Sequence, residues 1–246
     1  PLTPCNSMHR YADDTNLVVP ALNYQSCATG TEIDNVESWA KENNLTMNRT
    51  KSVEIVFVSP RSQRSVVIPQ PAVPGFTRVD TVKILGVTFS RKFSVTQHVE
   101  NILAASAQTL FALRTLRHHG MPVSAIQTVF QAIVVAKLSY ASPAWWGFAN
   151  MADRGRLEAF LRRSVRLGYR RTTDETLLDI CDRADDKLFA TIIDRGHRHL
   201  LFPLFPPERS QHYSFRKRSH NFQLPPRTSA LCDCNFVTRM LYKVIH

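Results

Sequence analysis

Hydrophobic residues follow two different periods along the chain, and the change falls near Ser94. Before Ser94, short runs that alternate apolar and polar residues predict strands, with one helical segment between them. After it, as far as Leu201, apolar residues recur every three or four positions, which predicts long helices. Further on, the chain is rich in Pro, Ser and Arg. We therefore expect an α+β region at 1–93, a helical region at 94–202 and a partly irregular tail at 203–246.

The first region opens with two β-prone runs, Met8–Tyr11 and Asn16–Val19, on either side of an acidic pair. This pattern predicts a β-hairpin with Asp13–Asp14 at its tight turn. A helix with Thr31 as its N-cap and an end at Asn43 should follow. Further strands are expected at Val53–Phe57, at Val66–Ile68 and at Val79–Phe89, the last interrupted by Gly86.

Four helices are expected in the second region, and a short one near the end of the chain. Capping residues, prolines and glycines mark where each should begin or end. The expected boundaries are a capping box of Ser94 with Gln97, an end at His118-His119-Gly120, a start at Pro122, a break at Pro143, a start near Asp153, a cap at Asp185 and a final helix over Phe236–Val244. The expected core face of the second helix is Ile126, Val129, Phe130, Ile133, Val134 and Leu138.

Composition narrows the choice of partners and compartment. The chain has 246 residues, 43% of them hydrophobic, which is enough for a sizeable core, and its formal net charge is +11. Such a basic balance favours nucleic acid or an anionic membrane surface. No apolar run approaches the roughly 20 residues of a membrane span, and no lipidation signal accompanies a basic helix, so we expect nucleic acid and no membrane.

The five cysteines are scattered and odd in number, so they do not form a disulfide framework. They indicate a reducing, intracellular compartment rather than secretion. Cys232 and Cys234, with His220 before them and His246 after, lack the usual spacing of a zinc site, so free thiols are expected.

The acidic pair is the candidate for chemistry. Phosphoryl transfer to a nucleic-acid 3′ end uses two divalent cations about 4 Å apart. Magnesium prefers hard oxygen ligands, and adjacent carboxylates on a rigid hairpin supply them. Because Asp is also a common turn residue, ordinary turn chemistry is the better explanation of a bare Asp-Asp. The residues around Asp13 and Asp14 must therefore decide between the two readings.

Those residues resemble a known family. Tyr11-Ala12-Asp13-Asp14-Thr15 resembles the catalytic palm hairpin of reverse transcriptases, and its wider context is similar to the non-LTR (LINE-type) retrotransposon branch. Three later stretches resemble further motifs of that branch in the same order, over roughly residues 8 to 170. They are Trp39-Ala40-x-x-Asn43-x-Leu45 with Met47-Asn48-x-x-Lys51-Ser52, the primer-gripping hairpin at Val82–Val87, and a thumb segment at Leu138–Gly147.

The resemblance implies a right-hand polymerase palm followed by a helical thumb, and RNA-directed DNA polymerase activity with Mg²⁺ or Mn²⁺. Asp13 would be a metal ligand with Asp14 as its catalytic neighbour, and Tyr11 would lie near the incoming nucleotide or primer end. Lys51 would face the departing pyrophosphate, where an ammonium offsets charge and can donate a proton. The implied partners are an RNA template, a DNA primer and deoxynucleoside triphosphates, and the implied place of action is the chromosome in the nucleus.

Each of the other candidate binding residues also has a purely structural interpretation. Leu85 and Gly86 would approach the primer backbone, but they also fit a bulge in a buried strand. Lys51 also fits a solvated loop lysine. Trp145 and Trp146 could stack on bases, although core positions are expected. Around the third helix, Arg162, Arg163 and Arg166 lie off the apolar face, and Arg170 and Arg171 lie just beyond it. These arginines could hold template-primer phosphates or form a solvated basic face.

The sequence also departs from the family. Its palm needs another carboxylate on a preceding strand, and its polymerase needs a fingers segment, and neither fits into the ten residues before Tyr11. We therefore expect half of a metal site, no DNA synthesis by this chain alone, and the remainder in an upstream part of the same polyprotein. The unpaired hairpin edge should leave residues 1–93 marginally stable. The alternatives are a truncated remnant that at most binds nucleic acid, and a plain binding module with an accidental Asp-Asp turn.

Overall fold

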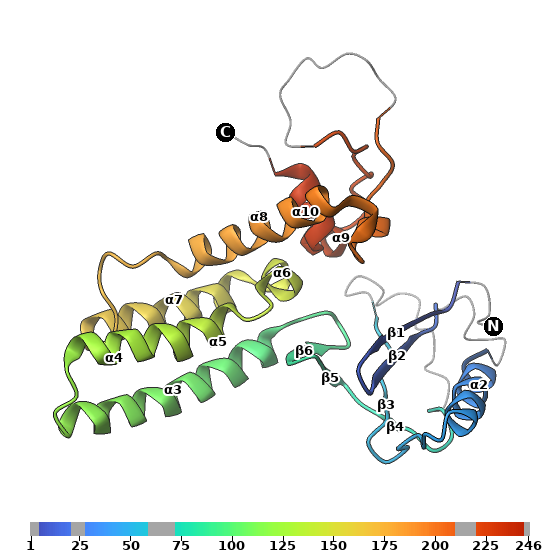
Figure 1. Ribbon diagram of the computed structural model, residues 1–246, viewed down its shortest axis with the longest axis horizontal. Helices are drawn as coiled ribbons and strands as arrows, with labels where there is room; N and C mark the ends of the chain where they lie inside the picture. The colour runs from blue at the N-terminus through green and yellow to red at the C-terminus, as the bar shows by residue number, and fades with distance from the viewer. Residues whose placement is uncertain (1–4, 21–27, 59–71, 210–219, 244–246) are drawn as a thin grey trace. The chain divides into compact units, whose positions relative to one another are not determined.

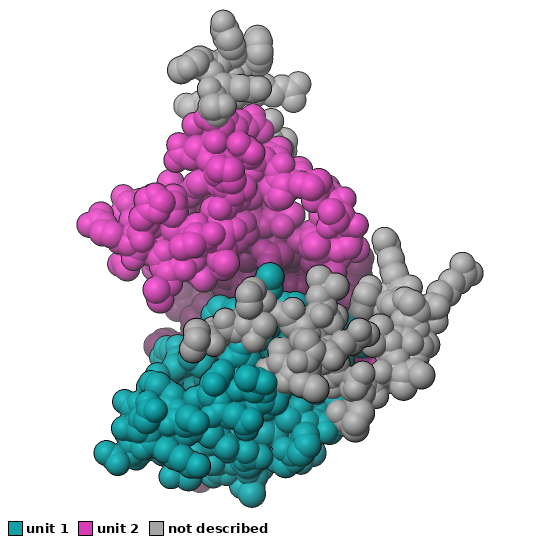
Figure 2. All heavy atoms as spheres, turned by 90° about the vertical axis from the view of Figure 1, so that its right-hand side faces the viewer, with its two compact units in different colours: residues 1–82 teal, residues 83–246 magenta. Residues whose placement is uncertain are grey.

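The computed structural model describes residues 5–20, 28–58, 72–209 and 220–243 (Figure 1). The chain divides into two compact units, Pro1–Val82 and Lys83–His246, which Figure 2 colours separately. This boundary falls before the expected one at Ser94. The reason is that Val87, in the last strand before the helices, belongs to the hydrophobic core of the second unit.

The first unit opens with the predicted hairpin. Strands β1 (Ser7–Tyr11) and β2 (Asp14–Val18) are antiparallel, and Tyr11 pairs with Asp14 across a two-residue turn. Among the described residues no third strand pairs with them. Helix α2 (Ala28–Glu42) packs against the hairpin, with the Arg10 guanidinium 4.5 Å from the centre of the Trp39 ring. That cation–π contact holds strand β1 against helix α2.

The ends of α2 test two predictions. The helix begins at Ala28, so Thr31 lies inside it and its expected role as N-cap is wrong. The predicted end is confirmed, because Asn44 takes a left-handed conformation with φ of 55° and the Asn43 side chain donates to the Trp39 carbonyl at 2.8 Å. Asparagine tolerates that conformation and often ends helices.

The remaining strands of the first unit are shorter than expected. Strand β3 covers only Val53–Glu54 and pairs in parallel with β4 (Thr77–Arg78). The Glu54 carboxylate accepts from the Arg78 guanidinium at 3.0 and 3.1 Å, which fastens the two strands together. The expected strand at Val66–Ile68 lies outside the described residues.

The second unit starts from the hairpin of β5 (Thr81–Ile84) and β6 (Val87–Ser90), followed by α3 (Thr96–His118). The expected capping box is wrong: Val95 occupies the N-cap without a side-chain bond, and the Ser94 hydroxyl instead accepts from the Thr96 backbone N–H at 3.3 Å. The predicted end is confirmed by Gly120, whose φ of 89° stops the helix.

The next helix is continuous through α4 (Val123–Val129), a π-helical turn (Phe130–Val135) and α5 (Ala136–Ser139). Pro122 precedes it as predicted. The wider π turn changes which residues face inward. Val134 and Val135 are both buried, whereas Ile133, expected in the core, is 46% exposed.

The chain turns earlier than Pro143, where a break was expected. Ala141 takes the left-handed conformation with φ of 49°, and α6 (Ser142–Trp145) begins directly after it, followed by a 3₁₀ turn (Trp146–Phe148). Pro143 therefore lies in the first turn of α6. A proline is tolerated there because the first N–H groups of a helix have no partner within it.

Length and composition alone make Val123–Phe148 a candidate membrane span, contrary to the expectation that no apolar run is long enough. Its unbroken helical part ends at Ser139, which limits that part to about 25 Å against a hydrocarbon thickness of about 30 Å. Ile126, Phe130 and Leu138 on one side of it are fully buried in the core of the unit. One side of the segment therefore belongs to the core of the second unit, while 28% of its most apolar 18-residue window is buried.

Two further long helices complete the bundle. Helix α7 (Met151–Arg166) starts at Asn150, whose side chain accepts from the Asp153 N–H. Helix α8 (Leu177–Arg195) starts at a capping box formed by Thr176 and Asp179. The expected cap Asp185 is wrong, because this residue lies inside α8 and is buried.

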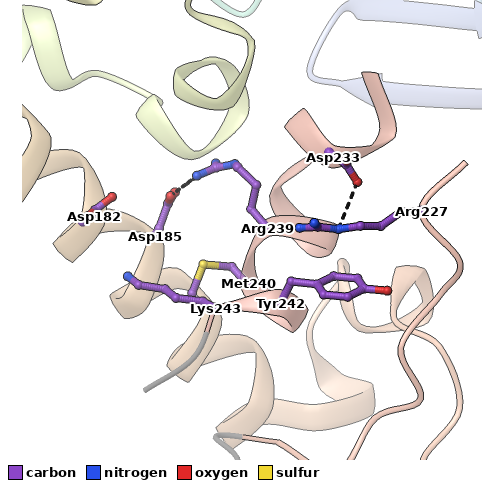
Figure 3. Close-up of a pocket in the computed structure, with 8 residues that line it drawn as sticks. All are labelled: Asp182, Asp185, Arg227, Asp233, Arg239, Met240, Tyr242 and Lys243. Atoms are coloured by element: carbon purple, nitrogen blue, oxygen red, sulfur yellow. Dashed lines mark hydrogen bonds and ion pairs between the residues drawn. The ribbon is translucent and has the colours of Figure 1, made fainter. Parts of the chain in front are cut away.

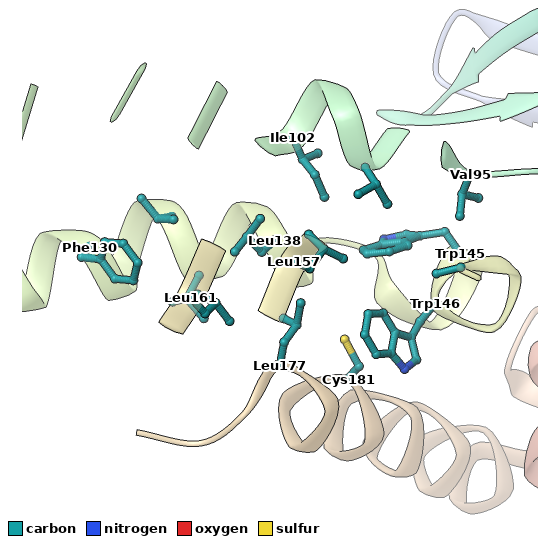
Figure 4. Packing of buried hydrophobic residues seen from close by; sticks show 14 of the residues in the cluster. Val95, Ile102, Phe130, Leu138, Trp145, Trp146, Leu157, Leu161, Leu177 and Cys181 are labelled. Atoms are coloured by element: carbon teal, nitrogen blue, oxygen red, sulfur yellow. The ribbon is translucent and has the colours of Figure 1, made fainter. Parts of the chain in front are cut away.

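The core of the bundle gathers around two tryptophans (Figure 4). Trp145 is fully buried and donates its indole N–H to the Tyr140 carbonyl at 2.8 Å, and Trp146 is 3% exposed. Both act as core anchors, as expected, and stacking on bases is excluded for these rings. Burial also raises the pKa of the Cys181 thiol to about 12, which keeps it neutral and unreactive.

A smaller second core joins the end of α8 to the last part of the chain. It consists of Phe189, Ile192, Phe205, Phe222, Met240 and Leu241. Helices α9 (Ala230–Cys234) and α10 (Phe236–Tyr242) close the described chain, in agreement with the final helix predicted from Phe236. Arg239 of α10 reaches buried Asp185 of α8 and also donates to the Pro143 carbonyl at 3.3 Å (Figure 3).

His98 should give the second unit a dependence on pH. Its ring lies 5.0 Å from that of Trp145, and burial, then the nearby charge of Lys83, lowers its pKa. Above about pH 6.5 the imidazole of His98 is neutral in both the folded and the unfolded chain. As pH falls from there towards the lowered pKa, the unfolded chain binds a proton that the folded chain does not, so the free energy of unfolding decreases. We expect the thermal midpoint to fall between pH 7 and 5, and to fall less in His98→Gln. Exposed His119→Gln is the control, and equal pH profiles for His98→Gln and the unmodified chain would contradict the prediction.

Candidate catalytic hairpin and nucleic-acid surface

The acidic pair lies at the tip of the β1–β2 hairpin. Asp13 is the second residue of the two-residue turn, and Asp14 is the first residue of β2, directly opposite Tyr11. All three side chains are exposed, Tyr11 to 66%. Ala12, the first turn residue, has φ of 52°, which a small residue accepts more easily than a bulky one. The hairpin thus presents two adjacent carboxylates and one aromatic ring to solvent.

The donor type of this pair fits magnesium, but the number of donors does not fill a two-ion site. Carboxylate oxygens are preferred ligands of Mg²⁺. Within the described ranges, no group of three or more His, Cys, Asp or Glu side chains could hold a metal ion. Two ions about 4 Å apart normally share more carboxylates than Asp13 and Asp14 provide. Asp13 and Asp14 alone therefore do not make up such a site.

Buried Glu32 of α2 does not complete the site. Its carboxylate accepts from the Asn6 side chain at 3.2 Å, and Asn6 directly precedes β1. The turn lies at the other end of the same strand, about 16 Å away at 3.3 Å per residue. Glu32 therefore fastens the open end of the hairpin to α2 and does not reach Asp13.

Lys51 lies in an exposed turn just before β3. Its backbone N–H donates to the Asn48 side chain at 3.2 Å, and neighbouring Arg49 pairs with Glu37 of α2 at 2.7 Å. The hydrogen bond from Arg49 lowers the pKa of Glu37. In the described part of the chain, no hydrogen bond or ion pair joins Lys51 to either carboxylate of the hairpin. Its position fits a solvated loop lysine as well as a leaving-group lysine.

Leu85 and Gly86 form the two-residue turn between β5 and β6. Their φ values of 45° and 90° are both positive, as in a type I′ hairpin turn. The alternative of a bulge in a buried strand is therefore wrong. The Tyr140 hydroxyl donates to the Leu85 carbonyl at 3.2 Å, and a Cβ on Gly86 would lie 3.1 Å from the Tyr140 ring. Tyr140 thus contacts both residues of this turn, Leu85 through its hydroxyl and Gly86 through its ring.

Tyr140 is the residue that the sequence argument missed. It lies in the Leu138–Gly147 stretch, and the turn lies in the Val82–Val87 stretch, so two motifs taken separately are in contact. The sequence offered one indication of this contact: both stretches resemble motifs of the same family, so both are expected in one folded structure. Neither stretch alone predicts the contact.

Gly86→Ala should destabilise the second unit by about 1–2 kcal/mol, because an alanine in the left-handed region carries a steric cost of that order. Crowding against the Tyr140 ring adds to it. Gly155→Ala is the matched control, since Gly155 lies inside α7 with nothing within 4 Å of an added Cβ. That control should stabilise by about 0.5–1 kcal/mol. Urea unfolding measures both, and equal effects of the two changes would refute the strained turn.

The three arginines expected to bind phosphate lie on α7 and are exposed. Arg170, further along, is 7% exposed, and its guanidinium bonds to the Glu175 carbonyl. It therefore supports the loop before α8 and is not available to a ligand. Arg162, Arg163 and Arg166 are exposed, and so is Arg171, whose guanidinium donates to the Gln127 side chain at 3.2 Å.

The expected site residues divide between the two units. Tyr11, Asp13, Asp14 and Lys51 belong to the first unit, and Leu85, Gly86 and the α7 arginines belong to the second. Comparison with models of known families, with curated proteins and with solved structures finds no match.

Proposed function

We propose that this chain is the carboxyl-terminal part of an RNA-directed DNA polymerase of the non-LTR retrotransposon type. The observation that carries the proposal is the hairpin, which presents exposed Asp13 and Asp14 at a two-residue turn beside exposed Tyr11. The order of the later motifs and the net charge of +11 support it. The substrates would be an RNA template, a DNA primer and deoxynucleoside triphosphates.

Each residue has a role in this proposal that follows from its chemistry. Asp13 and Asp14 would hold Mg²⁺ or Mn²⁺, which supplies a Lewis acid for phosphoryl transfer. Lys51 would offset charge on the pyrophosphate. The exposed Leu85–Gly86 turn would bring its backbone close to the primer. The remaining carboxylate would come from residues outside the described ranges, in an upstream part of the same polyprotein.

The test is primer extension by a longer polypeptide that adds the coding sequence upstream of Pro1. We expect it to incorporate nucleotides on an RNA template with Mg²⁺, while residues 1–246 alone incorporate none. Extension by the isolated chain would show that the carboxylate pair does not need a companion. Failure of the longer polypeptide, with a frame that encodes the missing strand-borne Asp, would refute the proposal.

A second candidate is a truncated remnant that binds nucleic acid without polymerising it. The observation in its favour is that β1 and β2 pair only with each other among the described residues. A stop codon immediately upstream of Pro1 would favour the remnant, and an open frame with a fingers-like segment would favour the polymerase. A plain binding module ranks below both because it leaves the ordered motifs unexplained.

A further inference from the structure

The carboxyl-terminal half of α3 carries an exposed aromatic ring among cations. Phe111 is 73% exposed, far more than any other phenylalanine of the described chain. Arg114 and His118, three and seven residues later, lie on the same side of the helix. Together with Thr115 and Arg117 they line a shallow hollow around the ring.

This side of α3 also borders α7. The Thr96 hydroxyl donates to Asp153 at 2.8 Å, and Arg156 pairs with Glu100 at 3.4 Å. At the other end, the Arg117 guanidinium donates to the Leu167 carbonyl at 2.7 Å. The two helices therefore run side by side in the same direction along most of α3.

That alignment places Arg163 of α7 at about the level of Phe111 along α3. Arg163 follows Arg156 by about two helical turns on the same edge of α7, and Phe111 follows Glu100 by about three turns on α3. The ion pair of Arg156 with Glu100 shows that these two residues lie at the same position along the two helix axes. Measured along those axes, Arg163 therefore lies within about one helical turn of Phe111. The two helices thus form one strip, defined as Phe111, Arg114, His118, Arg163 and Arg166.

The charge of this strip is not balanced locally. Residues 101–152 contain no acidic residue. The nearest acidic groups are engaged elsewhere. Glu158 of α7 accepts from the Leu177 N–H at 3.1 Å, Asp174 accepts from the Arg171 N–H, and Glu175 pairs with Arg183. Glu100 and Asp153 lie at the opposite end of α3. A positive strip of this kind attracts phosphates.

We propose that the strip binds single-stranded nucleic acid, with a base stacked on Phe111 and the flanking phosphates on Arg114 and Arg163. An exposed ring offers its face to a base only when that base is unstacked from its neighbours. In a duplex, phosphate contacts alone are accessible to such a strip, and they gain nothing from the ring. The inference deepens the proposed function, because it rests on a nucleic-acid substrate but not on polymer growth.

The experiment measures binding of the full chain to a fluorescent oligothymidine, an oligouridine of equal length and a duplex of the same length, by anisotropy. Phe111→Ala should weaken binding of the single strands about tenfold and leave the duplex nearly unchanged, and Phe111→Trp should restore stacking. Arg114→Gln should weaken all three probes and reduce the salt slope by about 0.7–0.9. Leu200→Ala and Arg198→Gln change exposed positions off the strip and are the controls.

Several results would overturn the inference. Unchanged single-strand binding by Phe111→Ala, or equal weakening for strands and duplex, removes the stacking role. Full rescue by Phe111→Leu shows that any apolar side chain suffices at this position, and it also removes the stacking role. The binding assay contains no nucleotides and no metal ion. Its outcome is therefore independent of primer extension: the strip can bind single strands in a chain that does not polymerise, and polymerase activity would not compensate for a failure to bind them.

Discussion

Replacing Asp13 with Asn in the longer polypeptide should reduce primer extension roughly 1000-fold, because divalent cations contribute several kcal/mol to the barrier of phosphoryl transfer. The amide keeps the shape of the side chain but loses the negative charge that a cation requires. The exposed turn should tolerate it, since Asn is as compatible with a hairpin turn as Asp. The fold is therefore preserved while the chemistry is removed, and the rate of nucleotide incorporation at saturating Mg²⁺ measures the difference.

Asp34→Asn provides the matched control. Asp34 is an exposed carboxylate of α2 in the same unit, away from the hairpin turn. Its replacement removes the same charge and should leave incorporation within about twofold, since surface charges of this kind contribute little. Undiminished incorporation by Asp13→Asn, or an equal loss in both variants, would disprove the role assigned to the pair.

Periodicity predicted the elements well where one face of an element is buried. The hairpin at Asp13–Asp14, the helix α3 with its end before Gly120 and the start of the following helix after Pro122 all have the expected type. Each depends on contacts within the element or between sequence neighbours. Such local preferences agree with the global fold in most proteins, which makes them readable from one sequence.

Helix starts were predicted less well, because several residues near each start are able to cap. Ser94, Thr31 and Asp185 all have capping side chains, but the N-caps in the described chain include Val95 and Thr176 instead. Asp185 shows the reason most clearly. Its carboxylate is used by Arg239, 54 residues later in the sequence, and no local pattern indicates that pairing.

The candidate site was predicted in part. The sequence indicated a hairpin with Asp13 and Asp14 at its turn, and the hairpin is confirmed, with Asp13 in the turn and Asp14 as the first residue of β2. The exposure of Arg162, Arg163 and Arg166 confirms that they lie off the apolar face of α7. Tyr140 and its contact with the Leu85–Gly86 turn depend on two segments folding together, which a pattern of hydrophobicity does not encode. The roles of these residues in polymerisation stay predictions.

The ion pair of Arg239 with Asp185 explains how the last helix is fixed to the bundle. The Asp185 side chain is only 2% exposed, and Arg239 also donates to the carbonyls of Cys234 and Pro143. A Cβ on Gly147 would collide with the Cys234 carbonyl and the Arg239 side chain, so the guanidinium fits closely over that glycine. One side chain therefore connects α8, α10 and the turn after α6.

Arg239→Met should cost about 3–5 kcal/mol of stability, because it leaves a buried carboxylate without its partner. Arg195→Met, an exposed site at the end of α8, is the control and should change stability by less than about 0.5 kcal/mol. Urea unfolding followed by the fluorescence of buried Trp145 and Trp146 measures both.

Two further results separate the loss of the partner from a loss of packing. Burial already raises the pKa of Asp185, against the lowering effect of Arg239, so removing Arg239 should raise this pKa further. Below its ordinary pKa, a carboxyl group is protonated in both the folded and the unfolded chain. As pH rises from there through the raised pKa, the unfolded chain loses this proton more readily than the folded chain, so the free energy of unfolding decreases. The penalty of Arg239→Met should thus be larger at pH 7 than at pH 5. Adding Asp185→Leu should recover most of the stability, since a buried pair is often replaceable by apolar residues. A penalty that is independent of pH and persists in the double variant would instead show that Arg239 acts through packing alone.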